Sequence, residues 1–194
     1  VGLLPTMVFA SGVTGSDKED DPYVYEVSTP SELSEAVTAI NADLSDSAHY
    51  YTISLQKDIE CNGLSFSKNT TTILGNGHKL TFKSYDGAIH VGSRAATHPV
   101  LILGGAQDTL TIEGAPSNDT YFIGVGAING GTEYGTLKMC DGVTITGATG
   151  NNYFGGAVTV AGGGTFEMKG GTIEKCGIDG GSVCFGGGVA VING

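Results

Sequence analysis

The chain has 194 residues, of which 40% are hydrophobic, and it contains 33 glycines but only 5 prolines. This hydrophobic content can fill the core of one domain, and glycines without a three-residue period exclude a collagen. A formal net charge of −11 with 9 Lys+Arg argues against nucleic acid or an anionic membrane surface as the main partner, because both select a positive protein surface.

The first residues suggest export. Residues 1–10, "VGLLPTMVFA", are apolar and end in Ala10 with Val8 two positions earlier, as at the end of a secretory signal peptide. A buried first strand is the alternative. Residues 11–26 are polar and acidic and are interpreted as a linker. No other stretch approaches the ~20 continuous apolar residues of a membrane span. We therefore expect a secreted or cell-surface protein without a membrane span in this sequence.

Residues 27–49 contain one predicted helix. Thr29 precedes Pro30, and Glu32 stands three positions after Thr29, which is the spacing of a capping box. Leu33, Val37, Ile40 and Leu44 then recur at helical spacing on one face. The pattern predicts a short amphipathic helix with one face to bury.

Residues 50–194 alternate with period two and contain a repeat of about 30 residues. Gly126-Ala127-Ile128 recurs as Gly156-Ala157-Val158 and as Gly187-Gly188-Val189, and "TLKM" at 136 recurs as "TFEM" at 165. A repeat made of short strands and glycine turns cannot bury its apolar side chains alone. Stacked copies can share one core.

Stacking predicts which side chains face inward. Alternation places Val158, Val160, Phe166, Met168 and Ile173 inside, with Ala157 and Thr159 outside. The expected inward rows are Ile128 over Val158 and Val189, Leu137 over Phe166, and Met139 over Met168. Lys138 over Glu167 is the expected outward pair.

The phrases "GGAVTV", "GTFEMKGGTI" and "GGGVAV", with the preamble "TPSELSEAV…YTISLQKDI…NTTTILGNGHKLTF", resemble the right-handed parallel β-helix proteins of the pectin-lyase-like group. They are also similar to repeats of polymorphic surface adhesins. The resemblance implies an all-β fold, a right-handed parallel β-helix (solenoid) over residues 50–194, with an N-terminal amphipathic capping helix. Because the sequence stops at Gly194 inside an expected strand, we expect the solenoid to be truncated at its C-terminal end.

Enzymes of this group carry clustered acids, with Ca²⁺ or an Arg base in lyases and paired Asp residues in hydrolases. No such cluster is found, and no catalytic residue or cofactor is predicted. "GAQDTL" at 105–110 resembles a phrase of pectin methylesterases, and "NDTYFIG" at 118–124 a second one. In register, however, Leu110 and Ile112 are core positions and Asp108 lies at a turn. The same phrase resembles one calcium-binding nonapeptide, but a single copy does not make a site.

Metal and disulfide sites are not indicated. The four cysteines, Cys61, Cys140, Cys176 and Cys184, form no C-x-x-C pair, and His49, His78, His90 and His98 have no i, i+4 spacing. Cys176 and Cys184 can pair across a turn, whereas four free packed thiols are the interpretation we prefer. His78 is interpreted as a turn element.

Two aromatic pairs, Tyr121-Phe122 and Tyr153-Phe154, precede glycine-led strands. They form either an outward strip for stacking on sugar rings or inner packing at the corners, which is the more common role of aromatic residues. The outward threonines at 132, 136, 159, 165 and 172 are too irregular for an ice-binding array.

Two functions remain. The first is a non-catalytic secreted or cell-surface module, adhesin-like or carbohydrate- or ligand-binding, whose partners are host or cell-wall glycans or surface proteins. The alternative is the N-terminal part of a polysaccharide-active enzyme, a lyase or hydrolase, with its site beyond Gly194.

Overall fold

A computed structural model describes residues 13–43, 49–83, 87–95, 97–115, 121–128, 130–150, 156–178 and 187–192. These residues form one helix and eighteen strands. The strands belong to three large sheets, named I, II and III here, and one two-stranded sheet. All pairings between strands are parallel in the described part of the chain. The fold is therefore mostly β with parallel sheets, as expected.

Sheet I has the order β1 (Tyr23–Val27), β2 (Tyr50–Leu55), β5 (Thr70–Leu74), β8 (Val100–Leu103), β11 (Gly135–Met139) and β15 (Gly164–Met168). Sheet II has the order β3 (Ile59–Cys61), β6 (Lys79–Phe82), β9 (Leu110–Glu113), β12 (Val143–Thr146) and β16 (Thr172–Glu174). Sheet III has the order β4 (Leu64–Phe66), β7 (Ile89–Val91), β10 (Ile123–Val125), β14 (Val158–Val160) and β18 (Val189–Val191). The small sheet pairs β13 (Thr149–Gly150) with β17 (Gly177–Ile178).

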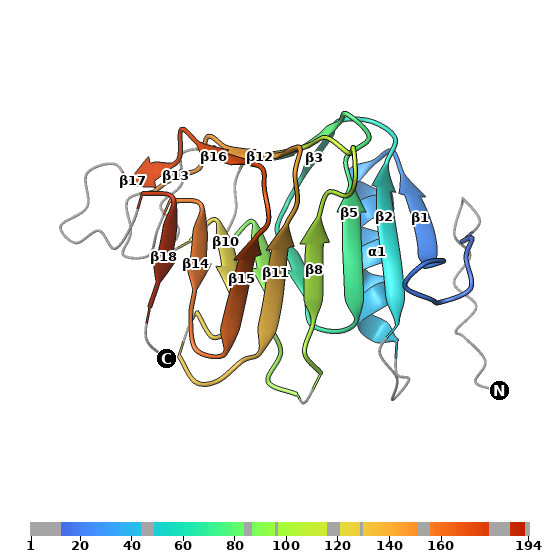
Figure 1. Ribbon diagram of the computed structural model, residues 1–194, viewed down its shortest axis with the longest axis horizontal. Coiled ribbons are helices and arrows are strands. Elements are labelled where there is room, and N and C mark those ends of the chain that lie inside the picture. The colour runs from blue at the N-terminus through green and yellow to red at the C-terminus, as the bar shows by residue number, and fades with distance from the viewer. Residues whose placement is uncertain are drawn as a thin grey trace.

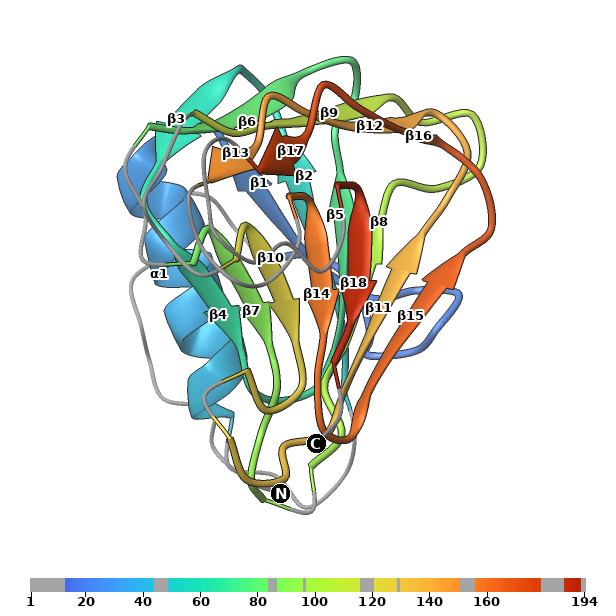
Figure 2. The ribbon, with the colours of Figure 1, turned by 90° about the vertical axis from the view of Figure 1, so that its left-hand side faces the viewer.

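The chain visits sheets I, II and III in turn, and we call one such passage a coil. From β2 onward, each strand pairs with the corresponding strand of the next coil, so that β2, β3 and β4 are followed by β5, β6 and β7. Figure 1 shows the strands side by side along the long axis, and Figure 2 shows the sheets as the sides of a wedge. This winding is consistent with a parallel β-helix.

The core consists of inward side chains that lie in rows across successive coils. In sheet I, Ile53, Ile73, Leu103 and Met139 occupy one register row and are all fully buried. Burying such a side chain contributes about 1.5 to 3 kcal/mol. Repeated over the three sheets, these rows supply the main stabilisation of the stack.

The expected rows at the later coils of sheet I are confirmed. Leu137 pairs with Phe166 and Met139 with Met168. The outward pair Lys138 and Glu167 is also in register, with 3.8 Å between Nζ and Oε2. The repeated "TLKM" and "TFEM" phrases therefore do mark equivalent strands.

The expected position of Ile128 is wrong. Val158 pairs with Val189, as predicted, but its partner on the other side is Ile123. The strand of this coil is Ile123–Val125, and Gly126, with φ +82°, ends it. Ile128 therefore follows the strand, where its side chain lies beside Gly124 on the outer face. The repeated Gly-Ala phrase is thus not in structural register between these coils.

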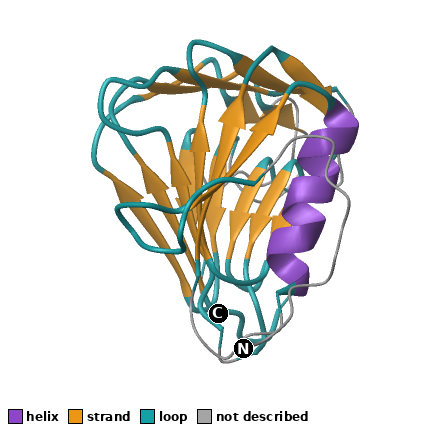
Figure 3. Cartoon of the chain, turned by 90° about the vertical axis from the view of Figure 1, so that its right-hand side faces the viewer, coloured by secondary structure: helices purple, strands orange, loops and turns teal. Residues whose placement is uncertain are grey.

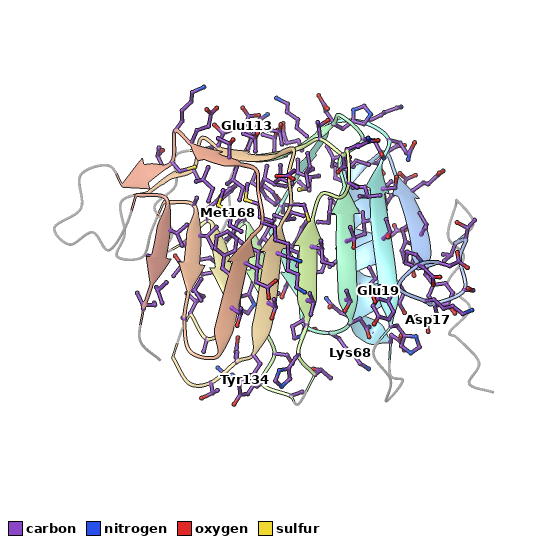
Figure 4. All side chains as sticks on the ribbon, in the orientation of Figure 1. Asp17, Glu19, Lys68, Glu113, Tyr134 and Met168 are labelled. Atoms are coloured by element: carbon purple, nitrogen blue, oxygen red, sulfur yellow. The ribbon has the colours of Figure 1, made fainter. Side chains whose placement is uncertain are left out.

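The predicted burial of the last coil also needs correction. Met168 is 49% exposed, and Phe166 and Ile173 are only half-buried. They lie on β15 and β16, the last described strands of sheets I and II, so no described coil covers them. Figure 4 shows Met168 among the side chains of this end.

Two residues predicted to be exposed are buried. Ala157 and Thr159 are each 0% exposed. Thr159 alternates with the inward Val158 and Val160 and so belongs to the outer face of sheet III, where its register partner is Gly124. Side chains from neighbouring loops pack over Gly124. Loop side chains therefore shield part of the outer face of sheet III from solvent.

Helix α1 (Pro30–Ala42) begins with the predicted capping box: Thr29 Oγ1 accepts from the Glu32 N–H, and Glu32 accepts from the Thr29 N–H. The backbone N–H of Ser28 also donates to Glu32, and this hydrogen bond lowers the pKa of its carboxyl. Leu33, Val37 and Ile40 are buried as predicted, whereas Leu44 lies outside the described residues. Figure 3 shows α1 alongside the strands at the N-terminal end of the stack.

Asn41 of α1 joins the helix to the first strand of sheet III. Its Nδ2 donates to the Ser65 carbonyl at 2.7 Å, and its Oδ1 accepts from the Ser67 N–H at 3.0 Å. β4 is the edge strand of sheet III, and an edge strand otherwise presents unpaired backbone groups. One side chain therefore makes the two bonds that a neighbouring strand would supply.

The segment expected to be a linker contains a strand. β1 covers Tyr23–Val27 and pairs with β2, whereas the sequence interpretation continued the linker to residue 26. Thr14 bridges Val24 on the other side of β1, with 2.8 Å from the Val24 N to the Thr14 O. Asp17 accepts hydrogen bonds from the Tyr50 N–H and the His49 ring. The described residues before Tyr23 thus lie against the sheet. Residues 1–12, expected to contain the end of a signal peptide, lie outside the described residues.

Leu137→Ala tests the inward rows. Leu137 is fully buried between Leu101 and Phe166, so its truncation is expected to lower the free energy of unfolding by about 2 to 5 kcal/mol in chemical denaturation. Thr165→Ala, an exposed position of the next coil, is the control and should change it by about 0.5 kcal/mol or less. Equal effects would contradict the assigned faces.

Hydrogen exchange tests the order of the coils. In the isolated 194-residue protein, β18 pairs only with β14 within the described structure, whereas β10 lies between β7 and β14. Amides of β18 should exchange much faster than those of β10, because edge strands open more easily. Equal, slow exchange in a dilute monomer would show that other residues cover β18.

Candidate ligand-binding site

The outer face of sheet III carries a cavity of about 360 Å³. Ser65 on β4, His90 on β7 and Gly124 on β10 are register partners on this face. Gly87 before β7, Tyr121 before β10 and the loops after β7 and β10 add further walls. Polar and aromatic groups among the lining residues are Ser65, His90, Arg94, Tyr121 and Glu133. The volume lies within the roughly 300–1,000 Å³ of small-molecule sites.

Glu133 is the centre of the charged groups in this cavity. Its Oε1 accepts from Arg94 Nε at 3.0 Å, and its Oε2 lies 3.3 Å from His90 Nε2. The Glu133 side chain is 17% exposed, whereas that of Arg94 is 74% exposed. The carboxylate is therefore held inside the cavity, and the guanidinium lies at its mouth.

The tautomer of His90 follows from its neighbours. Nε2 lies 3.1 Å from the Gly126 carbonyl oxygen as well as 3.3 Å from Glu133 Oε2. Both atoms are acceptors, so Nε2 must carry the proton in a neutral ring. Nδ1 is then an acceptor, and it has no hydrogen-bond partner among the described residues.

The two loops are clamped together, which brings Arg94 and Glu133 into contact. Ser93 and Tyr134 exchange two backbone hydrogen bonds of 3.0 Å. The rings of His98 and Tyr134 stack with centroids 4.6 Å apart and planes 12° apart. Figure 4 shows Tyr134 at the lower edge of the stack. Because both loops are fixed in this way, the ion pair joins residues 39 positions apart without needing a shared strand.

Tyr121 lies over two glycines, Gly87 just before β7 and Gly124 on β10. A Cβ at Gly87 would come within 2.4 Å of the tyrosine ring, and one at Gly124 within 2.7 Å. Real Cβ atoms cannot approach so closely, so the ring occupies space that only glycine leaves. The His90 ring lies nearby, with centroids 6.4 Å apart. Tyr121 is half-buried and forms an aromatic wall of the cavity.

The two residues of the first aromatic pair lie on different faces. Tyr121 is on the outer face, whereas Phe122 is 2% exposed and meets Phe82 edge to face, with centroids 5.8 Å apart. Tyr153 and Phe154 lie outside the described residues. Asp108 is structural: its carboxylate accepts from the Gly75 and Asn76 N–H groups at 2.9 and 2.7 Å. It therefore holds the turn of the preceding coil.

His78 and the described cysteines do not line the cavity. His78 makes a turn hydrogen bond to the Gly75 carbonyl and lies 3.3 Å from Asp58. Cys61, Cys140 and Cys176 are free thiols, and Cys184 lies outside the described residues. Burial raises the pKa of Cys61 to about 12 and also raises that of Cys176, so both thiols stay protonated near neutral pH.

A second polar cluster lies at the N-terminal end, where Asp17, Asp43, His49 and Tyr51 meet. The Tyr51 hydroxyl donates to Asp43 at 2.7 Å, and burial followed by this bond raises the pKa of Tyr51. The His49 ring lies between the two carboxylates and contacts Asp17 through Nδ1. These contacts join the end of α1 and the N-terminal segment to β2. We interpret them as structural.

Within the described residues, no group of three or more His, Cys, Asp or Glu side chains is placed to hold a metal ion. In the same part of the chain, no helix is long and apolar enough to cross a membrane. Sequence reasoning did not identify His90, Arg94 or Glu133. One signal was present, because Arg94 is the single arginine of the sequence.

Comparison with protein-family models, curated proteins and solved structures gave no match for this chain. The function must therefore be argued from the cavity itself.

Gly124→Ala tests the packing of the cavity floor. The new Cβ would lie 2.7 Å from Tyr121 Cε2 and 2.8 Å from Ile128 Cγ1, so displacement of these side chains should cost about 1 to 3 kcal/mol in chemical denaturation. Gly177→Ala is the matched control, because nothing lies within 4 Å of its Cβ position. Indistinguishable midpoints for the two variants would mean that Tyr121 does not rest on Gly124.

Proposed function

We propose that this protein is a secreted or cell-surface module that binds a carbohydrate or similar polar ligand and is not a catalyst. In this proposal the stacked sheets form a right-handed, pectin-lyase-like parallel β-helix, and α1 is its N-terminal cap. The sequence phrases support the family resemblance, and the repeated passage through sheets I, II and III supports the solenoid. The location outside the cell rests on the apolar residues 1–10.

The observation that carries the binding function is the cavity on the outer face of sheet III. It combines an aromatic wall, Tyr121, with hydrogen-bonding groups on Ser65, His90, Arg94 and Glu133. Binding sites for small polar ligands have this composition, with apolar surface for contact area and a few fixed polar groups for orientation. The polar groups come from strands in register and from clamped loops, so the site is largely preformed.

The same cavity disfavours glycoside hydrolysis. Hydrolases of that kind use two carboxyl groups about 5 to 9.5 Å apart, and among the described residues Glu133 is the single carboxylate that lines the cavity. Both of its oxygens already accept from Arg94 or face His90. A polysaccharide-active enzyme would therefore need its catalytic site elsewhere. The alternative function places that site beyond Gly194.

The test is binding of the purified chain to an array of immobilised oligosaccharides, followed by Tyr121→Ala. We expect binding to at least one glycan class and a loss of affinity of about tenfold or more in the variant, equivalent to about 1.4 kcal/mol or more. Tyr50→Ala, an outward tyrosine on sheet I, is the control and should bind normally. Absence of binding to every glycan, or equal binding by both variants, would contradict the proposal.

A further inference from the structure

The formal charges of the described residues that line the cavity cancel. Arg94 contributes one positive charge and Glu133 one negative charge, and the two groups are in direct contact. The whole chain, in contrast, carries a formal net charge of −11. The neutral ion pair neither attracts nor repels a charged ligand strongly, whereas the negative field of the whole chain repels anions and attracts cations.

An anionic ligand is disfavoured on two grounds. The negative field of the chain repels it, and Arg94, the one cation among the described lining residues, is already paired with Glu133. A cationic ligand is favoured by the overall field but would meet the Arg94 guanidinium at the mouth. A divalent cation such as Ca²⁺ takes 6 to 8 oxygen ligands, and the lining residues that the structure describes include a single carboxylate. The cavity is therefore suited to a neutral polar ligand.

The ion pair leaves some hydrogen-bonding positions of both Arg94 and Glu133 available to a ligand. Arg94 uses Nε for Glu133, and its two terminal nitrogens have no partner among the described residues. Each oxygen of Glu133 faces one protein group, and a carboxylate oxygen can accept two hydrogen bonds. Free donors and free acceptor positions therefore lie next to one another on two joined side chains.

This pairing matches two adjacent hydroxyl groups. One hydroxyl can donate to Glu133 while its neighbour accepts from Arg94, and both hydrogen bonds are assisted by charge. Nδ1 of His90 offers a further acceptor on the same face of sheet III. The aromatic face of Tyr121 suits the apolar C–H face of a sugar ring.

From these observations we propose that the cavity binds a neutral sugar ring through two adjacent hydroxyl groups held by Arg94 and Glu133. The inference rests on the proposed carbohydrate-binding function and names the ligand class of that site. Arg94 matters for its planar fork as well as for its charge, because lysine presents a single point of donation.

The experiment is an NMR titration of the ¹⁵N-labelled chain with cellobiose, mannobiose, digalacturonate and chitosan disaccharide. We expect shifts in the amides around Tyr121, Gly124 and Glu133 with at least one of the two neutral sugars. The acidic and the amino disaccharide should bind at least tenfold more weakly. For the neutral sugar that binds, the titration is repeated with the methyl glycoside of its ring and with forms of that glycoside that each lack one hydroxyl. The forms that bind more weakly identify the two hydroxyls that the protein contacts. Removal of either of two adjacent hydroxyls should lower affinity about tenfold.

Arg94→Lys and Glu133→Gln test the ion pair. Each should weaken binding of the neutral sugar about tenfold or more, because the first loses the fork and the second loses the charged acceptor. Glu113→Gln, which alters the Lys79–Glu113 pair of sheet II, is the matched control and should bind normally. Unchanged amide spectra away from the cavity confirm that the variants are folded.

The outcomes separate this inference from the proposed function. If no saccharide of any class binds, the carbohydrate-binding function itself fails. If the acidic or amino disaccharide binds as tightly as the neutral ones, binding stands and the neutral ligand class is overturned. If neutral sugars bind both ion-pair variants as tightly as they bind the unsubstituted protein, Arg94 and Glu133 are not the recognition groups.

Discussion

The register of the parallel strands determines the structure, because it stacks each inward apolar side chain on its counterpart in the next coil. The row Ile53, Ile73, Leu103 and Met139 shows the result: four residues from four coils, all fully buried. The same register fixes the outward positions. Ser65, His90 and Gly124 lie side by side on sheet III because Leu64, Ile89 and Ile123 are aligned in the core. The cavity is therefore positioned by packing on the opposite side of its own sheet.

The aligned strands supply only the floor of the cavity. The loops after β7 and β10 and the space left by two glycines complete the cavity. The hydrogen bonds between Ser93 and Tyr134 hold the loops of successive coils together, and Glu133 meets Arg94 and His90 beside that clamp. Gly87 and Gly124 leave space into which Tyr121 fits. The site thus depends on the absence of a side chain at these two glycines as much as on the side chains that line it. Its polar groups already face the cavity.

Features with a local signal could be predicted from the sequence. The capping box at Thr29 and Glu32 needs only neighbouring residues, and the match of "TLKM" with "TFEM" identified two strands of equal length correctly. Ile128 was misplaced because the Gly-Ala phrase repeats while the strand itself lies earlier, at Ile123–Val125. Arg94 and Glu133 lie on loops of different lengths, so no period in the sequence relates them. Their contact depends on tertiary structure, and only the rarity of arginine marked the position.

The bonds from Asn41 to β4 have a consequence for how such a stack can change in length. A helix side chain that satisfies this edge of sheet III closes the edge whatever the number of coils behind it. Duplication or deletion of an internal coil would leave this closure intact, provided that the coil next to the helix is kept. Variants with different numbers of coils can therefore arise without redesign of the N-terminal end. A duplication between the loops of Arg94 and Glu133, in contrast, would separate the ion pair and dismantle the cavity.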